Sequence, residues 1–157
     1  MSSRMVLSAA AGRITFVLND GGRAEAGYKG MAGDCVTRAI AIATGLPYQQ
    51  VYDDLKALAA EERITKRRQK RSSVRDGVHK ETSRRYLESL GWVFTPTMSI
   101  GSGCRVHLKA SELPSGRLIV KVTRHLTAVI NGVIHDTHDP SREGTRCVYG
   151  YFTKEQK

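Results

Sequence analysis

The dipeptide Asn131-Gly132 most constrains how this chain of 157 residues can fold. Asn-Gly between two apolar segments is the strongest short-range signal for a two-residue β-hairpin, because both residues tolerate the positive φ that such turns require. The flanking segments 126–130 and 133–136 are rich in β-branched residues, which favour strands. The predicted register pairs Ile130 with Val133, Ala128 with His135, and Thr127 with Asp136.

The same register brings a histidine and an aspartate to one face of the hairpin. Successive side chains of a strand point to opposite faces, so His125, Thr127 and Val129 share a face with Ile134, Asp136 and His138. Asp136 then lies diagonally across from His125, at a separation that the two side chains can nearly bridge. We therefore expect Asp136 to orient the His125 ring and to balance its charge.

The rest of the chain predicts helices first and strands afterwards. Apolar residues at helical spacing predict a helix that begins at Asp34-Cys35, with Asp34 as its N-cap, and ends at Gly45. A second helix is expected from Pro47, and a third helix ends at Gly91. Helices followed by an antiparallel sheet predict an α+β fold. Strands are expected at 13–18, 92–95, 118–122, 125–130, 133–136 and 147–153, with a chain reversal at 19–22.

Length and composition are typical of a single domain over 1–157. A hydrophobic fraction of 40% with four prolines is globular in character, and a chain of this length can bury a core without metal or disulfides. No apolar segment approaches the ~20 residues that a membrane-spanning helix needs, so we expect no membrane partner. The apolar stretch within 1–12 is shorter than the ~7–15-residue core of a signal peptide, so we expect no secretion.

The cysteines give a further expectation about the compartment. The chain has three cysteines at unrelated spacings, with no Cys-x-x-Cys pair. An odd number in this arrangement predicts neither a disulfide framework nor a zinc site. We therefore expect a reducing, cytoplasmic location, with Cys104 and Cys147 as structural residues.

Positive charge is concentrated between Arg63 and Arg85. This stretch holds ten of the lysines and arginines against only Asp76 and Glu81, so ten minus two gives +8 of the net +10. Broken periodicity predicts an exposed, mobile insertion at about 63–80. The cluster would bind nucleic acid phosphates, although a solvated surface is the alternative interpretation. The four cluster residues singled out are Arg67, Arg68, Lys70 and Arg71.

Cys35 is the candidate nucleophile. A thiol in the first turn of a helix faces unpaired N–H groups and the positive end of the helix dipole, which favour the thiolate. Cys35, His125 and Asp136 together match the nucleophile, base and orienting group of covalent thiol catalysis. The expected reaction is attack of the thiolate on a carbonyl carbon, with His125 acting first as acid and then as base.

Two segments resemble a known family. Gly33-Asp34-Cys35 with the following 36–40, and 125–132 with Asp136-Thr137, are similar to the papain-like cysteine peptidase superfamily. The greatest similarity is to small bacterial and phage members related to the double-glycine leader peptidases. The resemblance covers the Cys35 helix and the carboxy-terminal sheet, but covers the middle third poorly. It implies a helix carrying Cys35 packed on a sheet carrying His125, a peptide or protein substrate, and no cofactor.

Two positions depart from the family pattern. Members place a glutamine shortly before the nucleophile to bind the oxyanion, whereas this chain has Lys29 in that region. The tentative substitutes are Asn19 and Lys29, together with the Cys35 backbone N–H. Related enzymes often use an aspartate before proline as the orienting group, so Asp139, which precedes Pro140, is the alternative to Asp136.

Other readings compete with the hydrolase. A zinc site built from His125, His135, His138 and Cys147 matches no standard ligand spacing, and His135 and His138 would point to opposite strand faces. We therefore expect no metal. A catalytically inactive relative used for binding is the third possibility, and the missing glutamine is its best support.

Overall fold

The computed structural model describes residues 6–7, 15–30 and 32–154. Most of the stretch 1–12, and positions 13 and 14 of the strand expected at 13–18, lie outside these residues. The elements in chain order are β1 (Val6–Leu7), β2 (Thr15–Leu18), α1 (Cys35–Thr44), α2 (Tyr48–Ala60), α3 (Lys80–Ser89), β3 (Trp92–Pro96), the short 3-10 helix η1 (Ala110–Glu112), β4 (Arg117–Val122), β5 (His125–Ile130), β6 (Val133–Asp136) and β7 (Gly150–Lys154).

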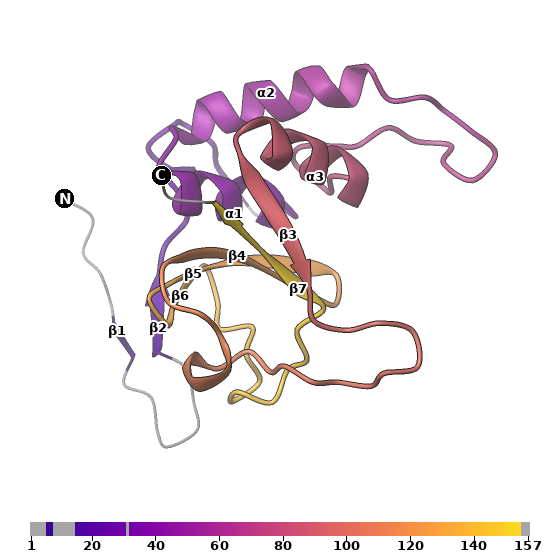
Figure 1. Ribbon diagram of the computed structural model, residues 1–157. Helices are drawn as coiled ribbons and strands as arrows, with labels where there is room; N and C mark the ends of the chain where they lie inside the picture. The colour runs from indigo at the N-terminus through magenta and orange to yellow at the C-terminus, as the bar shows by residue number, and fades with distance from the viewer. Residues whose placement is uncertain (1–5, 8–14, 31, 155–157) are drawn as a thin grey trace.

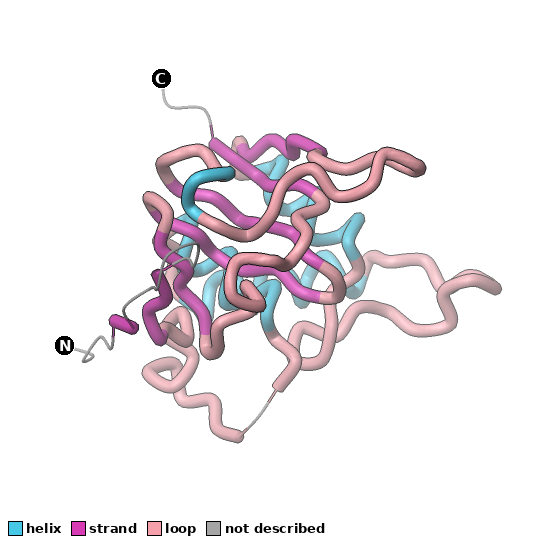
Figure 2. The backbone as a smooth tube through the Cα atoms, turned by 90° about the horizontal axis from the view of Figure 1, so that it is seen from below, coloured by secondary structure: helices cyan, strands magenta, loops and turns pink. Residues whose placement is uncertain are grey.

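The α+β prediction is confirmed. The described strands form one sheet in the order β1-β2-β6-β5-β4-β7-β3, and the three helices gather on one side of it (Figure 1). Viewed from the other side, loops lie in front of the strands and the helices behind them (Figure 2). Helix α1 begins at Cys35 and ends before Gly45, whose φ of 77° is the left-handed value that terminates helices.

The hairpin register is also confirmed. Ile130 pairs with Val133 and Ala128 with His135 in the antiparallel β5–β6 ladder. The two turn residues have φ angles of 48° at Asn131 and 78° at Gly132, as a primed turn requires. The turn chemistry therefore places His125, at the start of β5, and Asp136, at the end of β6, at the same edge of the sheet.

One pairing differs from the expected antiparallel sheet. β2 runs parallel to β6, with Leu18 opposite Asp136. A parallel pair needs a long crossover, and here the crossover contains all three helices as well as β3, β4 and β5. Asn19 continues past the ladder and donates its backbone N–H to the carbonyl of Asp136 at 2.8 Å. The amino-terminal strand is thereby joined to the edge that holds the candidate site.

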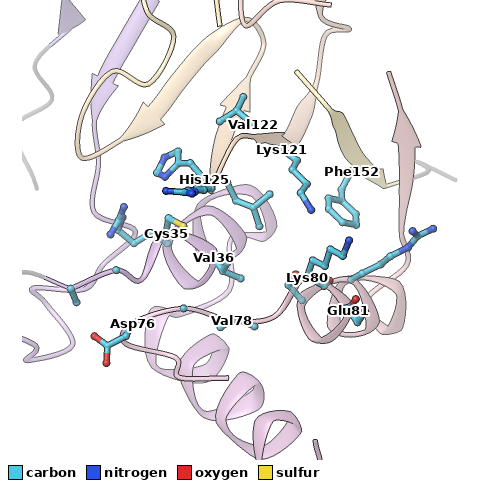
Figure 3. A pocket seen from close by; sticks show the side chains of 18 of the residues that line it. Cys35, Val36, Asp76, Val78, Lys80, Glu81, Lys121, Val122, His125 and Phe152 are labelled. Carbon is cyan, nitrogen blue, oxygen red and sulfur yellow. Dashed lines mark hydrogen bonds between the residues drawn. The ribbon is translucent and has the colours of Figure 1, made fainter. Parts of the chain in front are cut away.

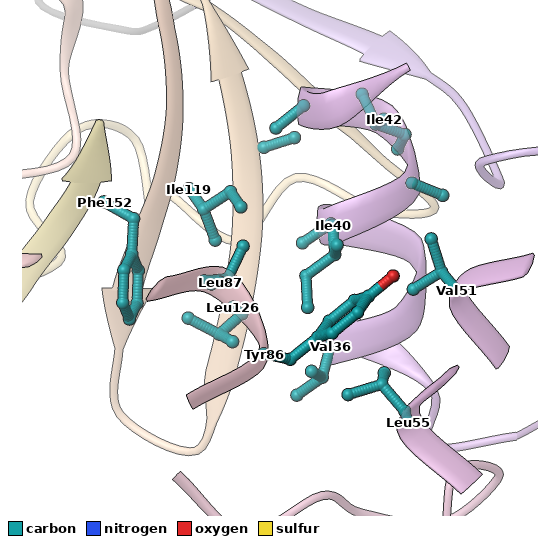
Figure 4. Close-up of a cluster of buried hydrophobic side chains, with 14 of the residues drawn as sticks. Val36, Ile40, Ile42, Val51, Leu55, Tyr86, Leu87, Ile119, Leu126 and Phe152 are labelled. Carbon is teal, nitrogen blue, oxygen red and sulfur yellow. The ribbon is translucent and has the colours of Figure 1, made fainter. Parts of the chain in front are cut away.

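Two apolar clusters cover the two faces of the sheet. On the helix side, apolar residues of α1, α2 and α3 pack against residues of β4, β5 and β7 such as Ile119, Leu126 and Phe152 (Figure 4). The opposite side packs Val120, Val129 and Ile134 with residues of the loops before and after η1. The strict alternation of Ile119 and Val120 between the two clusters shows that β4 is buried on both faces.

Gly150 allows β3 to pack closely on β7. A Cβ placed at Gly150 would lie 2.2 Å from the Phe94 ring and 2.8 Å from the Thr95 carbonyl oxygen. The Phe94 ring instead lies over this glycine and packs against Phe152, with the ring centroids 4.9 Å apart. The strand expected at 147–153 begins only at Gly150. Cys147 instead forms an isolated β-bridge with His107.

The expectation of no disulfide is wrong. Cys104 and Cys147 are joined, with their Cα atoms 5.7 Å apart, and Cys35 is the free cysteine of the chain. The bond ties the loop after β3 to the segment before β7. No helix in the described residues is long and apolar enough to span a bilayer.

The connection from α2 to α3 extends away from the body of the protein (Figure 1). Its two ends are held together by Glu62, whose carboxylate accepts hydrogen bonds from the Ser72 N–H and hydroxyl at 2.5 Å and from the Thr82 hydroxyl. Not all of the connection is exposed, because Val74 is buried in the helix-side cluster. The protruding part is therefore the stretch between Glu62 and Ser72.

Candidate active site

Three elements begin or end at one edge of the sheet and bring the predicted triad together. Helix α1 starts at Cys35, β5 starts at His125, and β6 ends at Asp136. Figure 3 shows the Cys35 sulfur beside the His125 ring, both facing a cavity. The segments are far apart in the sequence, and the packing of α1 on β5 joins them.

His125 is held between the thiol and the carboxylate. Its Nε2 donates to Asp136 Oδ2 at 2.7 Å, and the two side chains are 11% and 3% exposed. Because Nε2 is occupied by the carboxylate, Nδ1 is the ring nitrogen available to the Cys35 sulfur. Asp136 is itself fixed by the Thr127 hydroxyl, which donates to Oδ2 at 2.7 Å, and by the Thr137 N–H, which donates to Oδ1 at 2.7 Å.

The three groups shift one another's pKa values toward the charged forms. Burial alone would raise the pKa of Cys35, but hydrogen bonds from the His125 ring and the Leu126 N–H, and the charges of His125 and Arg38, lower it below 9.0. Burial would likewise lower the pKa of His125, yet its bonds and charge interactions with Asp136 and Cys35 raise it to about 9. At neutral pH this arrangement favours a thiolate beside an imidazolium.

The Asp136 carboxylate completes the charge balance. Burial would raise its pKa, whereas the His125 hydrogen bond and charge, and the bonds from Thr127 and Thr137, lower it. Arg38 of α1 approaches from the helix side, with Nη2 3.6 Å from Asp136 Oδ1. The carboxylate therefore stays ionised and can hold the His125 ring in one orientation and charge state.

Asp34 occupies the N-cap position of α1, as predicted, but its side chain does not cap the helix. It makes no side-chain cap hydrogen bond and is instead buried among two arginines and a tyrosine. Its carboxylate pairs with Arg38, lies 3.3 Å from Arg23 Nε, and accepts the Tyr48 hydroxyl at 2.5 Å. The guanidinium groups of the two arginines bind this carboxylate in place of the helix N–H groups. The resulting network holds Arg38 near Asp136.

The tentative oxyanion residues do not line the cavity. The Asn19 amide lies 3.3 Å from His135 Nδ1, and its oxygen accepts the Gly21 N–H at 2.8 Å. Lys29 is exposed and contributes its backbone carbonyl to Arg23. Neither residue is among those that form the cavity wall. Asp139, the alternative orienting group, is exposed and accepts the Ser141 N–H at 2.9 Å, whereas Asp136 is the carboxylate bonded to His125.

His138 is a further residue at the site. Its ring centroid lies 5.0 Å from that of His125, its Nδ1 is 3.9 Å from Asp136 Oδ1, and it lines the cavity. The predicted strand alternation placed His138 on the face of His125 and Asp136, but the one role considered for it in the sequence was that of a rejected zinc ligand.

The imagined zinc ligands are not assembled. Cys147 is in the disulfide, and His135 faces Asn19 rather than the cavity. Across the described ranges, no group of three or more histidines, cysteines, aspartates or glutamates is arranged to hold a metal ion.

The cavity beside Cys35 has a volume of about 870 Å³. The connection 76–78 and helix α3 form one wall, and β4, β5 and β7 form the other. Of the basic cluster, Arg68 pairs with Glu81 at 2.6 Å and Arg71 donates to the Glu62 carbonyl at 3.0 Å. Arg67 and Lys70 are exposed on the protruding stretch, away from the cavity wall.

Comparison of the chain with protein-family models, with curated proteins and with solved structures finds no match.

Proposed function

We propose that this protein is a cysteine-dependent hydrolase of amide bonds, with peptide or isopeptide as the substrate class. Cys35 is the nucleophile, His125 the acid and base, and Asp136 the group that orients His125. The observation that carries the proposal is the His125 ring, buried between a thiol of lowered pKa and a carboxylate 2.7 Å from Nε2. The resemblance of the Cys35 and His125 segments to papain-like peptidases supports the same assignment.

The reaction proceeds in two halves. The Cys35 thiolate attacks the carbonyl carbon and forms a C–S bond, and the His125 imidazolium gives its proton to the leaving amine as the C–N bond breaks. Neutral His125 then takes a proton from water, whose oxygen attacks the thioester and releases the acid and the Cys35 thiolate. The N–H groups in the first turn of α1 have no intrahelical acceptors and are the proposed oxyanion donors.

Alkylation of Cys35 tests the proposal without knowledge of the substrate. Cys35 is the free cysteine, so iodoacetamide without reductant reports on this thiol alone. At pH 6 we expect Cys35 to be alkylated faster than a simple thiol, because its lowered pKa leaves a larger fraction as thiolate. His125→Ala should remove most of this advantage. The matched control is His107→Ala, which removes another carboxylate-paired histidine outside the cavity and should leave the rate unchanged.

The same experiment separates the active enzyme from an inactive relative. A wild-type rate no faster than that of the simple thiol, unaltered by His125→Ala, would overturn the hydrolase and favour a binding protein. Where alkylation is fast, a mixture of peptides analysed by mass spectrometry identifies cleaved bonds, and Cys35→Ala should abolish every one of them.

The protruding basic stretch supports a second candidate function, binding of nucleic acid. Arg67 and Lys70 are exposed and make no ion pair within the described residues. Free cations of this kind bind phosphates through release of counterions. A double variant, Arg67→Gln with Lys70→Gln, should lower the affinity for a fluorescent duplex and flatten its salt dependence. An unchanged salt slope would show that the stretch is only a solvated surface.

The compartment stays a prediction. The cysteine count favoured a cytoplasmic protein, but the Cys104–Cys147 bond argues against a reducing environment, where disulfides are rare. We therefore propose that the protein works in a compartment oxidising enough to keep this disulfide.

A further inference from the structure

A lysine lies on the helix-facing side of the central strand β4. Val120 and Val122 point into the cluster on the far side of the sheet, so alternation directs Lys121 to the side of Ile119, which the helices cover. Lys121 is only partly exposed, and it lines the cavity. A charged group at such a position requires either a partner or access to water.

The structure places a second amine at the cavity, and Glu81 lies near enough to attract Lys121 but forms no ion pair with it. Lys80, the first residue of α3, lines the same cavity, and Figure 3 shows the two side chains directed toward one another beside Phe152. Within the described residues, neither amine forms an ion pair. Burial lowers the pKa of Lys121, and the positive charge of Lys80 lowers it further, against smaller raising effects of Glu81 and Tyr149. The two amines therefore repel each other.

The other charged groups of the cavity are already engaged or lie elsewhere. Glu81 is paired with Arg68 at 2.6 Å, and Arg84 with Glu88 at 2.9 Å. Asp76 interacts with Ser73, and Arg38 is held by Asp34 and Asp136. Arg124 lines the cavity next to His125 and adds another positive charge. The surplus charge inside the cavity is therefore positive and lies near Lys80 and Lys121.

We propose that Lys80 and Lys121 form a specificity subsite for a carboxylate of the substrate, an acidic side chain next to the scissile amide. The inference rests on the proposed function, since the subsite opens into the cavity of Cys35 and His125. Val36 and Leu126 also line the cavity and would contact the aliphatic part of that side chain. A carboxylate between the amines would relieve their repulsion and form two charge-assisted hydrogen bonds.

Two electrophiles of nearly equal shape test the subsite. N-Iodoacetyl-glutamate α-amide and N-iodoacetyl-glutamine α-amide both alkylate a thiolate, forming a C–S bond with loss of iodide, but only the first carries a carboxylate. We expect the glutamate probe to react with Cys35 about tenfold faster, which corresponds to one good charged hydrogen bond. The ratio of the two rates should fall as salt is added, and this measurement needs no variant.

Substitutions assign the effect to the two lysines. Lys80→Gln combined with Lys121→Met removes both charges while keeping the apolar stems, and it should bring the ratio of the two rates close to one. Lys56→Gln removes one positive charge from the exposed face of α2, outside the cavity, so it is the matched control for Lys80→Gln alone and should leave the ratio unchanged. If the double variant does not fold, Lys80→Gln alone should still lower the ratio.

The outcomes separate the two proposals. Fast alkylation by both probes with a salt-independent ratio near one would overturn the subsite and leave the hydrolase intact. Slow alkylation by both, no faster than that of a simple thiol, would overturn the hydrolase and the subsite with it. A high ratio that survives loss of both lysines would place the anion site elsewhere, and Arg124 would then be the residue to replace.

Discussion

His125 and Asp136 face each other across the β5–β6 hairpin, with Nε2 2.7 Å from Oδ2, although the last paired residues of that ladder are Ala128 and His135. The contact therefore depends on side chains that reach across the frayed end of the hairpin. Thr127 donates to the same carboxylate oxygen and holds it in place. A short polar cluster at a sheet edge thus fixes the one ring that faces the thiol.

Asp136→Asn should move the pH profile of Cys35 alkylation. The wild-type midpoint is expected below the pKa of an ordinary thiol, because the His125 ring and the Leu126 N–H lower the pKa of Cys35. Loss of the carboxylate charge lowers the pKa of His125 from about 9, so less of the ring is protonated and it stabilises the thiolate less. The midpoint should rise. Glu112→Gln, which alters the matched His107 pair outside the cavity, should not move it, and an unshifted midpoint in Asp136→Asn would contradict the proposed coupling.

The same pair makes the stability of the protein depend on pH. The folded-state pKa of His125 is raised, so its contribution is complete below 6.5 and is lost as the pH rises through about 9. The folded-state pKa of Asp136 is lowered, so its contribution is present above 3.8 and is lost at lower pH. Urea unfolding should therefore show the largest difference between wild type and Asp136→Asn between these limits. A difference that grows above pH 9 would contradict this sign.

Asp34→Ala should destabilise the fold strongly. The substitution leaves Arg38 and Tyr48 buried without the carboxylate that both contact, and removing one partner of a buried ion pair costs about 3–5 kcal/mol. The midpoint of urea unfolding measures the loss. Asp53→Ala removes an exposed carboxylate of α2 and should cost less than about 0.5 kcal/mol. Equal effects of the two substitutions would rule out the buried network as a source of stability.

Reduction of the Cys104–Cys147 bond should lower stability without changing the thiol chemistry. The bond closes a loop with a sequence separation of 43, for which the loss of unfolded-state entropy corresponds to about 4 kcal/mol. Thermal unfolding of the Cys104→Ala, Cys147→Ala variant measures this loss. Neither cysteine lines the cavity, so the alkylation rate of Cys35 should stay at the wild-type value. A fall in that rate would show that the disulfide influences Cys35 and would contradict this expectation.

Gly150→Ala should displace the Phe94 ring. The new Cβ would lie 2.2 Å from that ring, and overpacking of this kind costs about 1–3 kcal/mol. Phe94→Ala in the same chain removes the clash with the ring but not the 2.8 Å contact with the Thr95 carbonyl oxygen. The double variant should therefore recover part of the lost stability and be more stable than the two single effects predict when added. Gly101→Ala is the control for a glycine with open space around it, although its φ of 82° carries its own strain. Additive effects of the two changes would show that the ring and the glycine do not interact.

Local signals predicted most of the elements. The Asn131-Gly132 turn, whose geometry depends only on neighbouring residues, gave the correct register and brought His125 and Asp136 to one edge. The extent of α1 followed from apolar residues at helical spacing after Cys35 and from the glycine that ends the helix. These features depend on interactions over a few residues, which the sequence displays directly.

The features that were missed depend on residues distant in the sequence. The parallel pairing of β2 with β6 and the partners of Asp34 are set by tertiary packing. The disulfide requires two Cα atoms to lie 5.7 Å apart, which no spacing in the sequence encodes. Lys121 did carry a signal, because a charged residue alternating with valines in a predicted buried strand points to a polar cavity.

The order of the elements along the chain has a consequence during synthesis. Cys35 leaves the ribosome long before the hairpin that carries His125 and Asp136, because β5 and β6 follow all three helices. Until that hairpin docks, the sulfur lacks the ring that lowers its pKa, and β2 lacks its parallel neighbour. We therefore expect a nascent or truncated chain to carry an ordinary, weakly nucleophilic thiol, which gains its proposed reactivity only when β5 and β6 have docked.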